Sequence, residues 1–436
     1  MSTDNKSEVI QAFELASKNQ SVFSGIDRQE SMENFKRLGW PNARNEEWKY
    51  TNISKIIQAK PDFKKAQGSG VVTKEMVSQF LIAGADAFVL VFENGYFNKN
   101  LSSPSSAPDG VTIQNLSSVT GNETVNKYLG KVASEANEPF VALNTAFVND
   151  GVFIHIKQGK SISQPIHIIY INSSTNPDHT SSIRNLIVAE KGSKINISES
   201  YHSLNDEACG FMNSVTEVVV MQNAHVELVK AQLESNKSSH ISFTQAIQER
   251  DSLFDTVTVT LNGDLVRNNL HIKMNDINCT SHLFGLYILD GNQLVDNHTL
   301  VDHAMPNCFS NELYKGIIGG KATGVFNGKI FVRKDAQKTN AYQSNKNILL
   351  SDDAQMNTKP QLEIFADDVK CTHGATTGQI DEDALFYLRA RGIGEKNARA
   401  LLNIAFASDV LNNIKNELLK ENLLNLAVEK LHKNEK

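Results

Sequence analysis

A period of two in the apolar residues, sustained from about residue 150 to about residue 375, is the feature that most limits how this chain can fold. Side chains on one face of a strand recur at every second residue, so short apolar-x-apolar segments predict strands. Strands this short cannot bury their inner faces alone, and stacking them as coils provides that burial. Small polar turns separate the strands, as between "NLIVAE" and "KINISES", or between "TEVVVM" and "HVELV".

We therefore predict a mostly β protein whose core is a parallel β-helix. A β-sandwich rarely continues over so many residues without helices, whereas stacked coils can extend indefinitely. The tandem apolar-Gly-x-x-x-x units of a left-handed hexapeptide helix are absent, so the coils should be right-handed. We expect roughly nine or ten coils, with the apolar-x-apolar triplets pointing inward.

Helical patterns flank this region on both sides. Apolar residues at helical spacing predict a helix over residues 28–38 that ends at Gly39, and Asn94-Gly95 between two apolar runs predicts a β-hairpin. After the coils, leucine-rich stripes predict helices, one of them with Ser408 as its N-cap. These last helices should cap the solenoid, present a docking surface, or do both.

The predicted organisation has three parts. Residues 1–140 form an N-terminal helical or α+β region, residues 141–378 form the β-helix core, and residues 379–436 form a C-terminal helical domain.

Composition excludes several classes of protein. The 436 residues carry a formal net charge of -6, without the basic stripe interleaved with aromatics that nucleic-acid binding needs. The N-terminus has no signal-peptide pattern, and no run of about 18 apolar residues predicts a membrane span. The four cysteines lie far apart, so a zinc ribbon or a disulfide framework is not encoded and a cytoplasmic location is expected.

The common catalytic motifs are also absent. The sequence contains no GxxxxGK[ST] phosphate loop, no GxSxG and no HExxH, so nucleotide hydrolysis by this chain is not expected. A polysaccharide-active β-helix enzyme is one alternative, but the adjacent aspartates Asp352-Asp353 and Asp367-Asp368 face opposite ways on a strand and suit turns. A self-associating structural β-helix protein is another alternative.

The segment "VKCTHGAT" places Cys371 and His373 two residues apart. On a strand they share one face about 7 Å apart, which is too far for a thiol and its base to hydrogen bond. They could bind one metal or serve separate roles; alternatively, they are a buried thiol and a hydrogen-bonded histidine at a domain junction.

A second cluster occurs in "DNHTLVDHAMPNC". His298 and Asp302 share a strand face, and His303 faces the other way. These residues either ligate iron or zinc or form an internal hydrogen-bond ladder.

Several segments carry a family resemblance that covers nearly the whole chain. They are "NEEWKYT", "VDHAMPNCFSNELYKGI", and the block from "GVFNGKIFVRKDAQKTNAYQ" to "ALFYLRARGI" with the helical tail after it. With these segments the chain resembles the SufB/SufD family of iron–sulfur cluster assembly scaffolds. The early "NEEWKYT" and the short chain favour the SufD branch over the SufB branch.

The resemblance implies a non-ATPase scaffold that pairs with a SufB-like paralogue and docks the ATPase SufC through its C-terminal helices, in a complex that contains two copies of SufC. It assigns His373, and more weakly Cys371, to a cluster-building site at the SufB interface. Iron or a nascent cluster would be held there transiently, with no tightly bound cofactor on the isolated chain. Because the two paralogues have similar shapes, the isolated chain could also form a homodimer.

Overall fold

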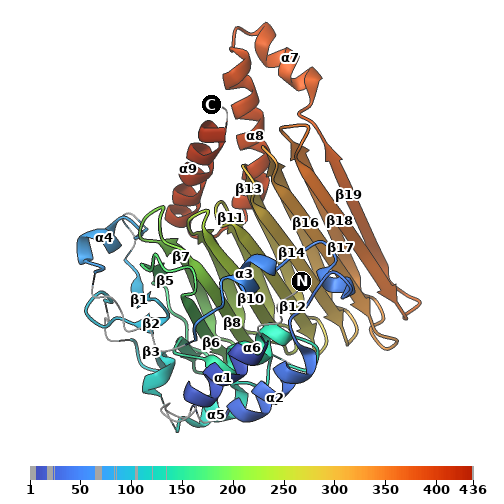
Figure 1. The fold of residues 1–436 in the computed structure, drawn as a ribbon. Coiled ribbons are helices and arrows are strands. Elements are labelled where there is room, and N and C mark those ends of the chain that lie inside the picture. Colours follow the sequence, from blue (N-terminus) through green and yellow to red (C-terminus); the bar gives the residue numbers. More distant parts are fainter. Residues whose placement is uncertain are drawn as a thin grey trace.

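The computed structural model describes residues 6–16, 23, 25–63, 71–82, 84, 86–103, 107–119, 121–133 and 135–434. Its core is the parallel β-solenoid that the period-two pattern predicts, because each coil gives one strand to each of two sheets (Figure 1). The first sheet has the order β19-β17-β15-β13-β11-β9-β7-β5-β1-β2, and the second has the order β18-β16-β14-β12-β10-β8-β6-β4-β3.

The strands have the following bounds. The first sheet contains β1 (Phe88–Glu93), β2 (Tyr96–Phe97), β5 (Ile166–Asn172), β7 (Lys194–Ser203), β9 (His225–Leu233), β11 (Leu253–Thr260), β13 (Thr280–Leu289), β15 (Phe309–Ile318), β17 (Asn340–Leu349) and β19 (Lys370–Gly378). The second contains β3 (Val111–Asn115), β4 (Val152–Ile156), β6 (Thr180–Ala189), β8 (Gly210–Val220), β10 (Ser238–Gln248), β12 (Leu265–Met274), β14 (Leu294–His303), β16 (Thr323–Val332) and β18 (Gln355–Ile364).

The solenoid has about eight turns, so the predicted nine or ten coils is too high. The reason is the length of the strands: most have about ten residues, and two such strands with their turns make one coil. Thr280, Phe309, Asn340 and Lys370 are therefore equivalent positions in consecutive coils.

Polar turn residues set the corner that precedes most strands of the first sheet. One residue in each of these turns has a positive φ, a conformation that glycine and asparagine adopt with least strain. This residue lies two positions before the strand, so the corners of successive coils stack on one another. The residues are Gly192, Asn223, Asp251, Asn278, Asn307 and Lys338.

The solenoid interior holds the main apolar core. Ile166 and Ile168 of β5 point into it, which confirms the inward triplet predicted for that strand. The triplet of Val257 and Val259 in β11 was predicted to point inward as well, and that prediction is wrong. These two valines point outward into a separate apolar cluster that the C-terminal helices cover.

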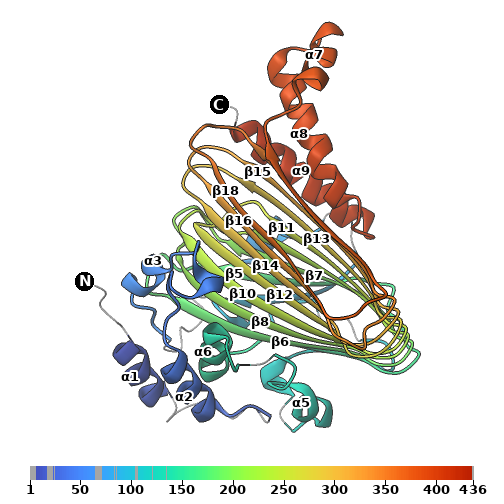
Figure 2. The same cartoon turned by 90° about the vertical axis from the view of Figure 1, so that its right-hand side faces the viewer.

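Three C-terminal helices follow the last coil: α7 (Glu382–Ala390), α8 (Glu395–Leu411) and α9 (Glu417–Asn434). Helices α8 and α9 pack on the outer face of the first sheet, whereas α7 projects beyond the coils (Figures 1 and 2). The expected N-cap at Ser408 is wrong, because this residue lies inside α8. Its hydroxyl donates to the carbonyl of Ile404, which satisfies a serine within a helix.

Most of the N-terminal region covers the outer face of the second sheet, whereas the segment with Val72 and Val77 packs against β1 and β5 of the first sheet. It contains α1 (Lys6–Ala16), α2 (Arg28–Leu38), η1 (Glu46–Trp48), α3 (Ser54–Gln58), α4 (Lys74–Ser78), η2 (Leu116–Ser118), α5 (Glu123–Tyr128) and α6 (Pro139–Phe147). Helix α2 and the hairpin of β1 and β2 confirm two local predictions. Strand β1 pairs in parallel with β5 and β3 pairs antiparallel with β4, so the earliest strands of the solenoid precede residue 141.

A buried ion pair fastens this region to the second sheet. The Nε of Arg184 in β6 donates to Oε2 of Glu217 in β8 over 2.9 Å, and both side chains are fully buried. The Glu217 carboxylate also accepts the backbone N–H groups of Gly130, Val132 and Ala133. Both charges are therefore compensated, as burial requires. Among the described helices, none is both long and apolar enough to cross a membrane.

Candidate functional site

The open end of the solenoid lies at β18 and β19 (Figure 1). Within the described residues, β18 pairs only with β16 and β19 pairs only with β17, so each sheet ends in a strand with one free edge. A free edge presents a row of unpaired N–H and C=O groups to a further strand. This end of the molecule can therefore accept another chain by strand pairing.

Cys371 and His373 both lie on β19, at this end. Their ladder partners on β17 are Ala341 and Gln343, which are buried on the inner face of the coil. Paired residues of a parallel sheet share a face, so both side chains belong to the inward-facing set. No further coil covers them, and His373 is consequently exposed while Cys371 is half-buried. The last coil thus presents residues at positions that the other coils bury.

A polar column leads from the interior to His373. Glu312 of β15 pairs with Gln343 of β17, which pairs with His373 of β19. The Nε2 of Gln343 donates to Oε2 of Glu312 over 2.8 Å. Gly328 of β16 makes room for this contact, since a Cβ there would lie 2.3 Å from the Gln343 Nε2 atom.

The electrostatics of the column favour uncharged groups below the histidine. Burial raises the pKa of Glu312 to about 7, although hydrogen bonds from Thr299 and Gln343 oppose the shift. A neutral Glu312 removes a negative charge that would otherwise lie beneath the surface. The only member of the column that solvent reaches is His373.

Cys371 has a different environment from His373. Its side chain packs against the apolar cluster that contains Ile330, Val332 and Ala341. Burial raises the pKa of the Cys371 thiol, so the thiol stays protonated at neutral pH. As it stands, Cys371 is a weaker metal ligand and a weaker nucleophile than a free thiolate.

In the part of the chain that the structure describes, the candidate ligands do not form a complete metal site. Among the described residues, no group of three or more His, Cys, Asp or Glu side chains has the geometry to hold a metal ion. The open end therefore offers at most part of a ligand set.

The candidate residues on β14, His298, Asp302 and His303, do not form one site. Asp302 pairs with the Arg333 guanidinium over 2.6 Å, and His298 contacts Asp296 and Glu47. His303 is buried with its Nε2 2.9 Å from the Ser310 hydroxyl. The hydrogen-bonded interpretation fits these residues better than the shared-ligand interpretation.

Comparison with known protein families accounts for nearly the whole chain. Residues 170–406 match the model described as "SUF system FeS cluster assembly, SufBD core domain", and residues 11–168 match "SufBD protein N-terminal region". The chain belongs to the SufBD family. It is thus an iron–sulfur cluster assembly protein and a homologue of SufD.

Individual relatives agree with this assignment to the SufBD family. An iron–sulfur cluster assembly SufBD family protein of Synechocystis is 33% identical over 415 residues, which cover 92% of this chain and 91% of the relative. The chloroplastic protein ABCI7 of Arabidopsis thaliana is 30% identical over 410 residues, covering 91% and 84%. SufD of Escherichia coli is 29% identical over 398 residues, covering 91% and 90%. The polysaccharide-active alternative gains no support from these relatives.

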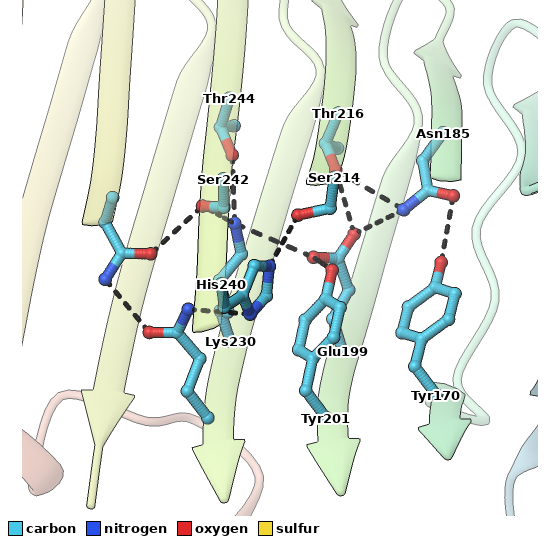
Figure 3. A network of polar contacts seen from close by, with 12 residues as sticks. Tyr170, Asn185, Glu199, Tyr201, Ser214, Thr216, Lys230, His240, Ser242 and Thr244 are labelled. Carbon is cyan, nitrogen blue, oxygen red and sulfur yellow. Dashed lines mark hydrogen bonds and ion pairs between the residues drawn. The ribbon is translucent and has the colours of Figure 1, made fainter. Parts of the chain in front are cut away.

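The SufBD chain also contains a charged network inside its early coils that sequence reasoning missed. Lys230 of β9 donates to the hydroxyls of Ser242 and Thr244, at 3.0 and 3.2 Å, and lies 4.0 Å from Glu199 of β7 (Figure 3). The other Glu199 oxygen accepts from Asn185. Burial lowers the pKa of Lys230, and these partners compensate its charge. The network is a hydrogen-bonded part of the core, remote from the open end.

Other features of this SufBD protein's open end were also missed. Glu312 and Gln343 lie beneath His373. Tyr342 of β17 and Phe365, the residue after β18, are also exposed in the last coils, Phe365 by 61%. The available signal was Gly378 and the helical pattern after it, which mark β19 as the last strand. Because β19 is the last strand, its side chains and those of the preceding coil lie at the open end of the solenoid.

Proposed function

We propose that this chain is the SufD-type scaffold subunit of a SUF complex and that its open end pairs with a SufB-like paralogue to complete a cluster-building site. The observation that carries the proposal is the pair of inward-facing residues, Cys371 and His373, on an uncovered last coil. A partner that adds its own edge strand would enclose both side chains between two solenoids.

Iron or a nascent cluster is the cargo of such an interface. Neutral imidazole is a good ligand for iron, and thiolates are the usual cluster ligands. His373 supplies the imidazole, Cys371 a thiol that needs deprotonation, and the paralogue must supply the remaining ligands. A site shared between two chains also opens when the chains separate, which allows the cargo to leave.

The C-terminal helices support a second contact, with the ATPase SufC. The α7 helix projects from the body and exposes Phe386 by 73% and Tyr387 by 57%, while Leu401 of α8 is 47% exposed. Exposed large apolar side chains that lie close together mark protein interaction sites. Because this chain lacks a phosphate-loop motif, we assign nucleotide hydrolysis to that partner.

The free edges of β18 and β19 would also allow two copies of the isolated chain to form a homodimer. Two copies of β18 and β19 can meet as this chain and its paralogue would, through an isologous contact. The four free cysteines fit a reducing compartment, so we place the complex in the cytoplasm.

Co-expression with the SufB-like and SufC proteins of the same host tests the proposal. Size-exclusion chromatography with light scattering should show one complex of all three chains, and iron and acid-labile sulfide should co-purify after anaerobic isolation. The proposal fails if this chain elutes alone in the presence of both proteins. It also fails if the complex forms with the same cluster content when β18 and β19 are blocked by proline substitutions.

A further inference from the structure

A ladder of small buried residues runs along one corner of the solenoid, immediately before the strands of the first sheet. Each member follows the turn residue with positive φ, and each is at most 1% exposed. Most members are serine, alanine or threonine, so small size is the common requirement. Two consecutive coils instead carry cysteine: the ladder reads Ser193, Ala224, Ser252, Cys279, Cys308 and Thr339.

The two thiols converge on one point. Cys279 precedes β13 and Cys308 precedes β15, and the backbone N–H of Phe309 donates to the carbonyl of Cys279 over 2.9 Å. Both thiols donate to the carbonyl oxygen of Asp276, at 3.1 Å from Cys279 and 3.3 Å from Cys308. Two sulfurs that share an acceptor on stacked coils are close neighbours.

A histidine next to the thiols is incompletely satisfied. His303 is fully buried; its Nε2 contacts Ser310, but its Nδ1 has no hydrogen-bond partner among the described residues. A buried polar atom without a partner is unfavourable unless it has a further role. Here the imidazole is available to the chemistry of Cys308.

The two thiols also differ in acidity. The Cys279 thiol, by hydrogen bonding to Cys308, lowers the pKa of the Cys308 thiol below its usual value, and His303 contributes to the shift. The same hydrogen bond, with burial, raises the pKa of Cys279 well above its usual value. Cys308 is therefore the thiol that ionises more readily and Cys279 the neighbouring thiol, as in an attacking and resolving pair.

We propose that Cys279 and Cys308 form a reversible disulfide that joins two consecutive coils when the protein meets hydrogen peroxide. The Cys308 thiolate attacks one peroxide oxygen; an S–O bond forms, the O–O bond breaks, and hydroxide leaves and takes up a proton as water. The Cys279 sulfur then attacks the Cys308 sulfenic acid as its proton passes to the leaving oxygen. The S–S bond forms, the S–O bond breaks and a second water leaves, so two thiols and one peroxide give one disulfide and two waters.

The disulfide would stiffen the coils that lie beneath the C-terminal helices. It would bind β13 to β15, and both strands lie beneath α8. The turns next to the thiols expose Asn278 and Asn307, so a molecule as small as peroxide has a short path to the sulfurs. A dithiol at this place would make the stiffness of the coils under the C-terminal helices depend on oxidation.

The experiment uses the full-length protein, reduced and then treated with hydrogen peroxide. Peptide mass spectrometry under non-reducing conditions should show Cys279 linked to Cys308, with loss of two of the four free thiols. Dithiothreitol should restore both thiols. Cys308→Ser should reduce the rate of thiol loss by about tenfold, whereas Cys279→Ser should leave a Cys308 sulfenic acid that dimedone traps.

Serine is a matched substitution because the ladder already contains Ser193 and Ser252, and circular dichroism checks that each variant is folded. Cys209→Ser is the control, since Cys209 is half-exposed and distant in sequence, and this variant should form the linked peptide as wild type does. His303→Gln should slow disulfide formation in a protein that keeps its melting temperature. The inference is overturned if peroxide-treated, folded wild type contains no linked peptide, or if Cys209 or Cys371 loses its thiol first.

Discussion

His373 stacks directly on Gln343 in the parallel ladder between β17 and β19, as the last member of a column that begins at Glu312. Elsewhere in the solenoid, the next coil would bury such a residue. At the open end, the imidazole faces whatever chain approaches the two free strand edges. A residue at an interior position is thus presented as a surface residue.

The first prediction concerns this imidazole. His373→Ala should leave the fold near wild type, because an exposed side chain contributes about 1 kcal/mol or less to stability. It should lower the iron and sulfide content of the assembled complex, because one proposed ligand is lost. Metal and sulfide analysis per complex, with the melting temperature of each variant, measures both effects.

Cys371→Ser is the matched comparison for that variant and should have the smaller effect. Its thiol is half-buried in an apolar cluster and stays protonated. If His373→Ala assembles clusters normally, or lowers cluster content only by unfolding the chain, the proposed ligand role is wrong.

The second prediction concerns the exposed aromatic pair on α7. Replacing Phe386 and Tyr387 together by serine should weaken SufC binding at least about tenfold, because both rings are more than half exposed and available to a partner. Isothermal titration with purified SufC measures the change. Leu418→Ser, on α9 and 41% exposed, is the control outside α7.

Point variants are preferable to removal of residues 380–436. Removal would uncover the outward apolar side chains of the first sheet, including Val257, Val259 and Ile317. A truncated chain could lose SufC binding through aggregation alone. Unchanged affinity in the folded double variant would place the SufC contact elsewhere.

The third prediction is a pH dependence that arises at Glu312. Its pKa rises from an ordinary 4.5 to about 7 on folding, chiefly through burial. Between pH 4.5 and pH 7, Glu312 is protonated in the folded state but ionised in the unfolded state. The contribution of the Glu312 proton to the free energy of unfolding is therefore lost as pH rises through 7. The free energy of unfolding of Glu312→Gln, relative to that of wild type, should therefore increase from pH 5 to pH 8 by up to about 3 kcal/mol.

Urea unfolding of both proteins at the two pH values measures this gain. Glu363→Gln, at a half-exposed carboxylate paired with Lys329, is the control for loss of a carboxylate outside the core. An equal offset between Glu312→Gln and wild type at both pH values would refute a proton bound at Glu312.

The fourth prediction tests the ion pair between Arg184 and Glu217. Glu217→Gln should destabilise the protein by about 3 kcal/mol, because it leaves a fully buried guanidinium without its anion. The double variant Arg184→Met, Glu217→Gln should recover part of the loss. Glu207→Gln, which removes an exposed partner of Lys237, should have little effect by thermal unfolding. Equal effects of the buried and the exposed substitution would contradict the role of burial.

The sequence was sufficient to predict the β-helix because alternation of apolar residues at period two is a direct consequence of strand geometry. Alternation does not show which of the two faces is inside, since a shift of one residue exchanges them. Val257 and Val259 illustrate this point: their triplet has the inward form, but α8 and α9 cover it from outside. The number of coils was overestimated for a related reason, because short apolar segments do not reveal ten-residue strands.

The candidate site could be predicted only in part. Cys371 and His373 share a strand face through local geometry, which spacing alone reveals. Gln343 and Glu312 lie beneath His373 because of the register between coils, and that register depends on the length of every intervening turn. The charged network around Lys230 has the same cause, since the partners of Lys230 come from two other strands, β7 and β10.

The return of α8 and α9 to the middle of the solenoid changes how the stack can come apart. In a simple array of repeats, each unit contacts only its neighbours, and unzipping starts at a free end. Here the chain leaves the last coil and is fastened again beside β9 and β11, where the backbone N–H of Lys415 donates to Glu227 over 2.9 Å. The terminal coils are thus enclosed in a loop anchored at both ends. Fraying at the open edge cannot spread inward without also detaching these helices, so the edge can stay open to a partner while the stack behind it remains intact.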